Sequence, residues 1–184
     1  QIPRLTDAGI YCHIGREDAV ASTKAFIGQV ICSVLFTLWM AQQRGKLSEG
    51  MKEQYIDALL KLPEQATQVL QQEHKAKKIA EQVIAPASNV LFMGRKQNAV
   101  VAFEGALKVK EITFNEAGDG VHAIGIAAGE MKHGTIAMVN EKCPVVVIIP
   151  KDSVYTATMN NFKEVQARSA PIIVVTTEGA VLPK

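Results

Sequence analysis

The chain has 184 residues, of which 48% are hydrophobic and 21% charged, with a formal net charge of +2 at pH 7. A chain of this length can bury one ample core, or hold one domain plus part of another. The near-neutral charge and the scattered lysines provide no basic patch, so the composition excludes nucleic acid as the expected partner.

The three cysteines, Cys12, Cys32 and Cys143, are odd in number and far apart in the sequence, without metal-ligand or redox spacing. We therefore expect buried thiols in a reducing compartment and predict a cytoplasmic protein. No signal peptide is visible in residues 1–5, and the chain begins without Met, which predicts that it starts inside a longer protein.

Residues 8–14 (AGIYCHI) have the length and composition of a β-strand, and a helical pattern follows them. A strand that leads through a loop into a helix is half of a βαβ unit. Because its partner strands would have to precede Gln1, we expect a first domain of which this chain carries the end.

The helix that follows is predicted over residues 24–43, with Ser22 as N-cap and an end at Arg44 and Gly45. Its apolar core, residues 25–41, is shorter than the roughly 20 residues of a membrane span and carries polar side chains. We therefore predict a buried core helix and no membrane partner.

Residues 47–86 have a more polar, helical pattern that predicts a connector between a first domain (1–46) and a second (87–184). Ser48 is the predicted cap of its first helix and Pro63 opens its second. The apolar positions expected to face inward are Met51, Tyr55, Leu59 and Leu62 in the first helix, and Val69, Leu70, Ile79 and Val83 in the second.

The second domain alternates strands with helices. Strands are predicted at residues 89–93, 144–149 and 172–176, and helices around Glu104 and over residues 153–168. Such alternation is typical of a doubly wound α/β fold, in which helices cover both faces of a parallel sheet.

A charged stripe runs along the first of these helices, because Glu104, Lys108 and Glu111 recur at offsets of four and seven. The stripe is either an ion pair of Glu104 with Lys108 beside a solvated Glu111, or an acid/base site. The rest of the circumference is apolar, which predicts a buried helix: Val100, Val101, Phe103, Ala106, Leu107, Val109, Ile112 and Phe114.

The loop after the first of these strands, residues 94–98 (GRKQN), lies where parallel sheets bind anions. Asn98 is a candidate cap, and Arg95 and Lys96 supply charge. An ordinary strand-to-helix turn explains the same residues, because a lone glycine is a weak phosphate signal.

Three segments together resemble the glucosamine-6-phosphate synthase family, in its isomerase part: DAVASTKAF (18–26), EGALKVKEI (104–112) and AAGEMKHGTIAM (127–138). They occur in that family's order, and the resemblance covers nearly the whole chain, weakly over residues 47–86. It implies two sugar isomerase (SIS) domains, the helical end of a truncated first one and most of a second.

The resemblance also implies residue roles. Glu111 is the base that carries a proton between carbons 1 and 2 of an opened sugar phosphate, and Lys108 holds the substrate with Glu104 as its partner. Val20 and Ser22 lie in a segment that lines the sugar site. The implied reaction forms glucosamine 6-phosphate from fructose 6-phosphate and ammonia, without metal or cofactor.

By the same resemblance His133 opens the sugar ring in the site of a neighbouring subunit, which implies a homodimer. Without the motif, a histidine between Lys132 and Gly134 reads as a surface loop residue. A metal site made by His122, Glu130, His133 and Asp119 is conceivable by residue type, but its ligand spacing is not compact.

The chain also departs from the family. A Ser/Thr-rich phosphate loop, an imine-forming tail lysine and the glutaminase domain are not in this sequence, so we expect little or no turnover from the chain alone. The segment between Glu111 and His133 carries an apparent insertion with Gly118, Gly120 and Gly125, which predicts a flexible loop.

Two other classes of function remain open at this point. The chain could be a non-catalytic sugar-phosphate-binding regulatory module, which retention of Glu111 and His133 argues against. It could also be a structural dimerisation module, which predicts self-association without any dependence on sugar phosphate.

Overall fold

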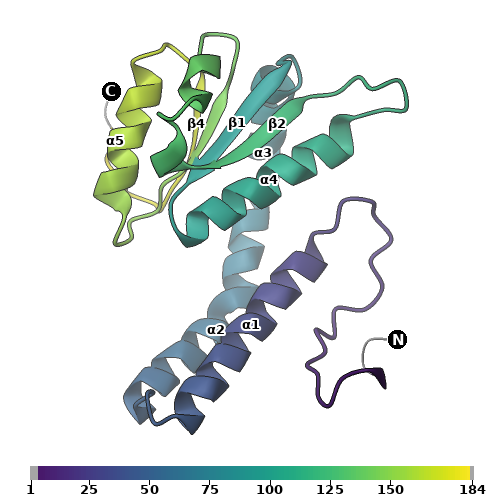
Figure 1. Cartoon of the computed structure of the whole chain (residues 1–184), viewed down its shortest axis with the longest axis vertical. Coiled ribbons are helices and arrows are strands. Elements are labelled where there is room, and N and C mark those ends of the chain that lie inside the picture. The colour runs from purple at the N-terminus through teal and green to yellow at the C-terminus, as the bar shows by residue number, and fades with distance from the viewer. Residues whose placement is uncertain (1–3, 183–184) are drawn as a thin grey trace. The chain divides into compact units, whose positions relative to one another are not determined.

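The computed structural model describes residues 4–182 and is shown in Figure 1. Its contacts divide the chain into two compact units, Gln1–Glu73 and His74–Lys184. The helical connector predicted for residues 47–86 is therefore shared between the two units. Each unit is described by itself.

The first unit is a helical hairpin of α1, Lys24–Gln43, and α2, Glu49–Leu70. The predicted bounds of α1 are confirmed. Ser48 is confirmed as the N-cap of α2, since its side chain accepts a hydrogen bond from the Met51 backbone N–H at 3.3 Å. Local capping chemistry was sufficient to locate the start of this helix.

The prediction that α1 is buried is wrong, because Gly28 is its only buried residue. Within the described part of the chain, α1 is the one helix long and apolar enough to cross a membrane, and only 6% of its most apolar window is buried. Length and composition alone are weak grounds for a span, since core helices of soluble proteins pass the same test. The groove between α1 and α2, about 640 Å³ in volume, is lined mainly by apolar side chains.

The strand predicted for residues 8–14 is also wrong, because this segment has no regular structure. Ile10 and Tyr11 are 57% and 60% exposed. A strand needs a neighbour to satisfy its backbone groups, and the described residues of the first unit include no other strand. The apolar composition of the segment was therefore not sufficient.

Pro63 does not separate two helices, contrary to prediction, because α2 continues through it. The helix instead ends at Leu70, and α3, Glu73–Ile79, passes into a turn of π-helix, Ala80–Ile84. A proline inside a helix costs a backbone hydrogen bond but need not end the helix where neighbouring turns hold it. Several apolar positions predicted to face inward are exposed: Met51, Tyr55, Leu62, Val69 and Leu70.

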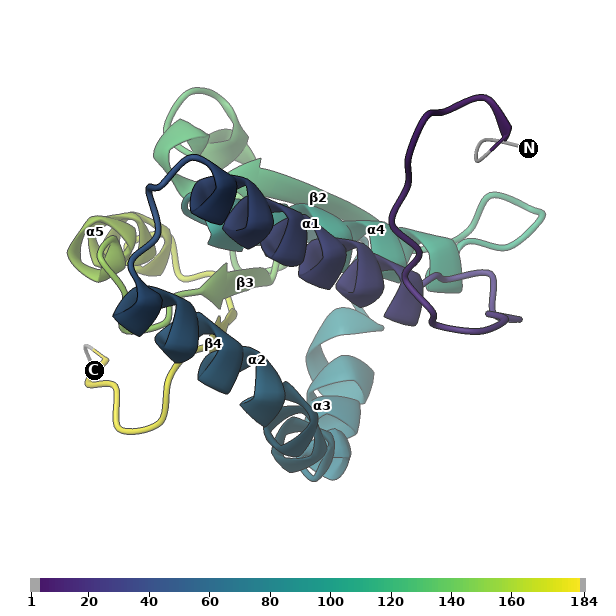
Figure 2. The same cartoon turned by 90° about the horizontal axis from the view of Figure 1, so that it is seen from below.

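The second unit contains a four-stranded parallel sheet in the order β2-β1-β3-β4. Its strands are β1, Asn89–Gly94; β2, His122–Ala127; β3, Val145–Ile148; and β4, Ile172–Val175. Helices α4, Gln97–Thr113, and α5, Tyr155–Gln166, lie on opposite faces of the sheet (Figures 1 and 2). The doubly wound α/β prediction is confirmed.

Side chains alternate between the two faces along each strand. Leu91 and Met93 of β1 point into the larger core, which includes Phe162 and Val165 of α5. Val90 belongs to a smaller cluster on the other face, against which Val109 of α4 packs. Because both faces are covered, these strands are apolar in continuous runs.

Strand β2 was missed by the sequence analysis, which took residues 118–125 for a flexible loop. The strand pairs along its whole length with β1, from Asn89 beside His122 to Gly94 beside Ala127. The turn before it is organised by Asn115, whose Oδ1 accepts hydrogen bonds from the backbone N–H groups of residues 117 and 119 at 2.9 and 3.0 Å. The insertion is thus a closed turn followed by a strand.

Helix α4 is buried on one side only, whereas the sequence predicted burial all round. The residues that it buries against the sheet are the small ones, Ala99, Ala102 and Ala106. Larger apolar side chains of the helix are 40–71% exposed: Val100, Val101, Phe103, Leu107 and Ile112. Small residues on the sheet side let the helix approach closely, which the count of apolar positions could not reveal.

Candidate functional site

The charged stripe of α4 is a single connected group in which Lys108 contacts both carboxylates. Its Nζ lies 3.4 Å from Glu104 Oε1 and 2.5 Å from Glu111 Oε2. The side chains of Glu104, Lys108 and Glu111 are 23%, 17% and 30% exposed, so the group is screened from solvent without being sealed. The interpretation of Glu111 as merely solvated is therefore wrong.

The electrostatics of the stripe keep Lys108 protonated. Its hydrogen bond to Glu111 raises the pKa of the lysine, burial lowers it, and the nearby charges of Glu104 and Glu111 raise it further. A lysine held in its charged form between two carboxylates can orient them, or can hold an anionic or carbonyl oxygen of a ligand.

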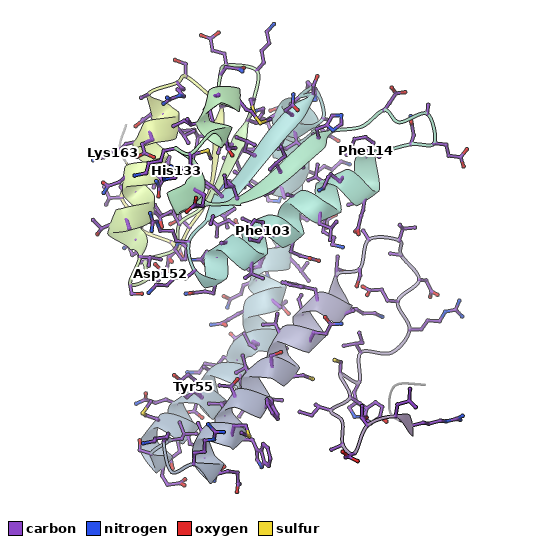
Figure 3. All side chains as sticks on the ribbon, viewed as in Figure 1. Tyr55, Phe103, Phe114, His133, Asp152 and Lys163 are labelled. Atoms are coloured by element: carbon purple, nitrogen blue, oxygen red, sulfur yellow. The ribbon has the colours of Figure 1, made fainter. Side chains whose placement is uncertain are left out.

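His133 lies on an exposed turn between two short 3₁₀ turns, Ala128–Glu130 and Thr135–Met138. Its backbone N–H donates to the Glu130 carbonyl at 3.0 Å. Met131 is fully buried beneath the turn and anchors it in the core. The motif thus places His133 on the surface, near α5 (Figure 3).

Within one chain, the fold holds Glu111 and His133 near opposite ends of the strands, His133 at the carboxyl ends and Glu111 towards the amino ends. His133 follows the carboxyl end of β2, the edge at which α4 also begins. Glu111 lies about 20 Å further along α4 at 1.5 Å per residue. Three residues after Glu111 comes Phe114 (Figure 3), whose ring packs on that of His122, the first residue of β2, with centroids 5.0 Å apart.

Val20 and Ser22 lie in the first unit, in the segment that leads into α1. Val20 is 89% exposed. Ser22 does not cap the helix, contrary to prediction: its Oγ donates to Glu17 Oε2 at 2.7 Å, and the N-cap position belongs to Thr23. The capping group is Glu17, which the sequence analysis missed. Its carboxylate accepts the backbone N–H groups of Thr23 and Lys24 at 2.8 and 3.0 Å.

The loop after β1 is tied to the elements that follow β3. Asn98 Nδ2 donates to Asp152 Oδ2 at 2.8 Å, and Arg95 Nε donates to Asn161 Oδ1 at 3.2 Å. The predicted cap is wrong, since Asn98 lies inside α4 and Lys96 occupies the N-cap position. These contacts favour the ordinary strand-to-helix turn over an anion site.

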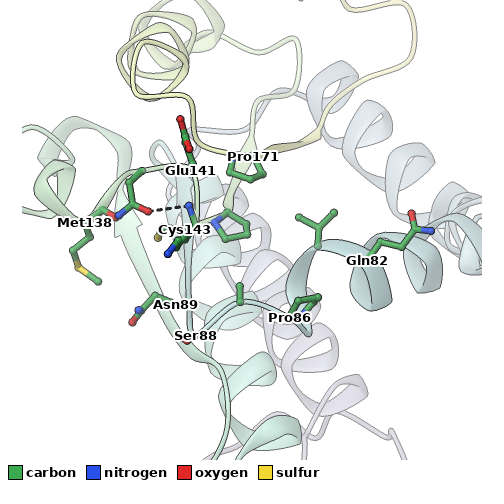
Figure 4. A pocket seen from close by; sticks show the side chains of 13 residues that line it. Gln82, Pro86, Ser88, Asn89, Met138, Glu141, Cys143 and Pro171 are labelled. Carbon is green, nitrogen blue, oxygen red and sulfur yellow. Dashed lines mark hydrogen bonds between the residues drawn. The ribbon is translucent and has the colours of Figure 1, made fainter.

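A pocket of about 700 Å³ in the second unit lies at the amino ends of the strands (Figure 4). It is bordered by the residues where strands begin, among them Asn89, Cys143 and Pro171. Neither Glu111 nor His133 lines it, so the pocket contributes nothing to the chemistry considered above.

The metal alternative fails on geometry. His122 packs on Phe114 at the start of β2, whereas His133 and Glu130 follow its end. Among residues 4–182, no three side chains of the histidine, cysteine, aspartate or glutamate type come close enough to hold a metal ion.

Comparison with known proteins supplies the family. The model of the SIS domain matches residues 83–181, which is more than half of the chain. The chain belongs to the SIS domain family. The match covers the whole parallel sheet and both helices that pack on it, and it lies within the second unit.

Relatives of this SIS domain protein are named glutamine–fructose-6-phosphate aminotransferase (isomerizing). The one from Corynebacterium glutamicum is 43% identical over 182 residues, and that from Chlorobaculum tepidum 42% over 179. Each match covers 97% of this chain and 28% of the relative. The chain therefore spans little more than a quarter of the length of these relatives.

Solved structures agree with the SIS assignment. The C-terminal domain of glucosamine-fructose-6-phosphate aminotransferase from Francisella tularensis superposes with a TM-score of 0.83 at 32% identity, over 89% of this chain and 44% of that one. A putative phosphosugar isomerase from Silicibacter pomeroyi has a TM-score of 0.73 at 22% identity, over 99% and 51%, and shares the fold.

Proposed function

We propose that this chain is part of the isomerase portion of a glutamine–fructose-6-phosphate aminotransferase, which forms glucosamine 6-phosphate from fructose 6-phosphate and ammonia in the cytoplasm. The observation that carries the proposal is the Glu104–Lys108–Glu111 stripe, joined through Lys108, in a chain 43% identical to such an enzyme over 97% of its length. The proposal concerns the complete protein, to which a glutaminase domain would supply ammonia.

Glu111 is the proposed base. The isomerisation moves a proton between carbons 1 and 2 of the open-chain sugar, and one carboxylate can take the proton from one carbon and return it to the other on the same face. Lys108 orients Glu111 through the 2.5 Å contact, and Glu104 holds the other side of Lys108 at 3.4 Å. Val20 and Ser22 are the proposed contacts to the sugar from the first unit.

We assign His133 to the site of a neighbouring subunit, where it opens the sugar ring. The reason is topological, since its own chain holds Glu111 near the opposite ends of the strands, and a side chain cannot bridge that span. The exposed position of His133 on an anchored turn suits a residue offered to another chain. A homodimer is therefore part of the proposal.

The decisive substitution is Glu111→Gln. It can be made in a chimera in which this chain replaces the matching 28% of the Corynebacterium glutamicum relative. We expect exchange of the carbon 2 proton with solvent to fall at least about 100-fold, because the base is lost, while binding of the sugar phosphate persists. Exchange is measured by NMR in D₂O and binding by calorimetry.

The matched control is Glu116→Gln, the same change at an exposed carboxylate in the turn after α4. It should leave both exchange and binding unchanged. Retained exchange in Glu111→Gln would contradict the assignment of the base. If the unsubstituted chimera binds the sugar phosphate but shows no proton exchange, a regulatory binding module is favoured instead.

A further inference from the structure

Two of the three cysteines meet in the first unit, although they lie far apart in the sequence. Cys32 Sγ, on α1, donates to Cys12 Sγ, on the irregular segment before the helix, with the two sulfur atoms 3.7 Å apart. Cys143 is buried in the other unit. The prediction of buried thiols is wrong for this pair, because Cys12 and Cys32 are only partly buried.

Gly28 is what brings the two thiols together. It lies one turn before Cys32 on α1 and is the only buried residue of that helix. A Cβ atom added at Gly28 would lie 2.7 Å from Ile14 Cγ2 and 3.3 Å from Cys12 Cβ. The segment around Cys12 thus rests directly on the backbone of α1, at a point where only glycine leaves room.

The two cysteines differ from Cys143 in their exposure. Cys12 and Cys32 are each partly exposed, whereas Cys143 is only 3% exposed. A pair of neighbouring, partly exposed thiols, one on an irregular segment and one on a helix, is suited to reversible oxidation.

We propose that Cys12 and Cys32 form a redox-sensitive site that closes into a disulfide when it reacts with a low-molecular-weight disulfide. The Cys12 thiolate attacks one sulfur of that disulfide and releases the first small thiol. Cys32 then gives its proton to solvent, attacks the Cys12 sulfur and releases the second small thiol. Two protein thiols are oxidised, and the small disulfide is reduced to two thiols.

The order of attack follows from the contact between the thiols. Cys32 donates a hydrogen bond to Cys12, so Cys12 Sγ is the acceptor of the pair. Burial, followed by the hydrogen bond and the charge of Cys12, raises the pKa of the Cys32 thiol. Cys12 is therefore the attacking sulfur and Cys32 the resolving one.

Closure of this bond would tie down the entire segment that leads into α1. The loop between Cys12 and Cys32 contains Glu17, which caps the helix, and also Val20 and Ser22. The redox site does not depend on the proposed function, but its state would constrain the segment that the function assigns to the sugar.

The test treats the full chain with glutathione and its disulfide at fixed ratios, alkylates the remaining thiols after denaturation, and maps the cysteines by mass spectrometry. We expect one Cys12–Cys32 bond within the chain, an alkylated Cys143, and reversal by excess glutathione. Cys143→Ser should behave as the unsubstituted chain. Cys12→Ser and Cys32→Ser should each lose the bond and keep at most a glutathione adduct.

A second pair of variants tests the geometry. Gly28→Ala should lower the equilibrium constant for closure at least about tenfold, because the methyl group displaces Cys12 from Cys32. Gly50→Ala is the control, since a Cβ at Gly50 meets nothing within 4 Å. Circular dichroism verifies the helices of both variants.

Three results would overturn the proposal. They are stable glutathione adducts on both Cys12 and Cys32 of the unsubstituted chain, disulfides formed between chains in place of the internal one, and equal closure in a folded Gly28→Ala. The mapping of the unsubstituted chain decides the matter by itself if Gly28→Ala does not fold.

Discussion

At the scale of single residues, Glu17 has an influence that its position in the sequence does not suggest. Its carboxylate accepts the Thr23 and Lys24 backbone N–H groups and the Ser22 hydroxyl. These bonds, the one from Thr23 first, lower the pKa of Glu17 from 4.5 to about 2. A carboxylate at a helix N-terminus also interacts favourably with the helix dipole.

Glu17 should make the stability of α1 depend on pH in the acid range. Its pKa is lower in the folded chain, so its contribution to the free energy of unfolding is complete above about pH 4.5 and is lost as pH falls towards about 2. Glu17→Gln should remove that dependence. The measurement is thermal unfolding followed by circular dichroism at a series of pH values from about 6 down to about 2.

Asp18→Asn is the control for this titration. Asp18 is the adjacent carboxylate and pairs with Arg16 at 2.5 Å on the surface, with 72% of its side chain exposed. The variant should retain the acid dependence of the unsubstituted chain. A loss in Asp18→Asn as large as in Glu17→Gln would mean that general charge, and not the cap, stabilises α1.

Residue-level prediction succeeded where the interaction is local. The spacing of Glu104, Lys108 and Glu111 follows from helix geometry, and their contacts in the structure obey it. Glu17 could not be found in this way, because a cap that reaches the helix from Glu17 depends on how the irregular segment folds back. The meeting of Cys12 and Cys32 has the same origin.

At the scale of elements, α4 and β2 approach so closely that one strand position has no room for a side chain. A Cβ at Gly125 would lie 2.5 Å from Phe103 Cα and 2.9 Å from Phe103 N, both backbone atoms of α4. The glycine that made β2 look like a loop is therefore the residue that lets the helix pack on it.

Gly125→Ala should lower the free energy of unfolding of the second unit by about 3 kcal/mol, because α4 must move as a whole to admit the methyl group. Chemical denaturation followed by circular dichroism measures the loss. Glu104, Lys108 and Glu111 would shift with the helix, so catalytic proton exchange in the chimera should fall as well.

Gly105→Ala is the graded comparison on the same helix. Its Cβ would meet the Phe92 ring at 3.1 Å, and that ring can turn aside. Alanine also favours a helix over glycine by about 1 kcal/mol. Gly105→Ala should therefore stay within about 1 kcal/mol of the unsubstituted chain. If Gly125→Ala and Gly105→Ala lose the same free energy of unfolding, the close packing of α4 on Gly125 is not what limits stability.

The strands that were predicted correctly are those formed by uninterrupted runs of apolar residues. Strands β1, β3 and β4 are apolar runs bounded by turn residues, and the structure contains all three. Residues 8–14 have a similar composition but no partner strand, so the same pattern failed there. Strand formation depends on pairing, which the composition of one segment does not report.

At the scale of the whole molecule, the proposed site is divided between subunits. Two defective chains should therefore complement each other. Co-expression of chimeras carrying Glu111→Gln and His133→Ala should restore activity to about a quarter of normal, since random pairing gives half mixed dimers and each of these has one intact site. Activity is measured as glucosamine 6-phosphate formed per dimer.

Each variant expressed alone should be defective, with His133→Ala slower on the cyclic sugar than on an open-chain analogue. Chains mixed after separate folding provide the control, because they exchange only if the dimer dissociates. Complete absence of rescue in a mixed dimer that is shown to form would argue for sites made within one chain.

The fold class and the family could both be predicted from the sequence. The alternation of strands and helices indicates the fold class, and three motifs in the expected order indicate the family. The division into units was less accessible. The boundary falls between Glu73 and His74, inside a run of helix, where composition gives no signal.

The rate at which the buried thiol of Cys143 is modified reports on local opening of the second unit. The thiol is 3% exposed at the entrance to β3, and burial raises its pKa. Because the thiol is covered although it borders the pocket at the amino ends of the strands, its modification requires a local opening there, and the rate of modification measures that opening. The second unit therefore contains a natural thiol probe of local opening, and no cysteine has to be introduced to measure it.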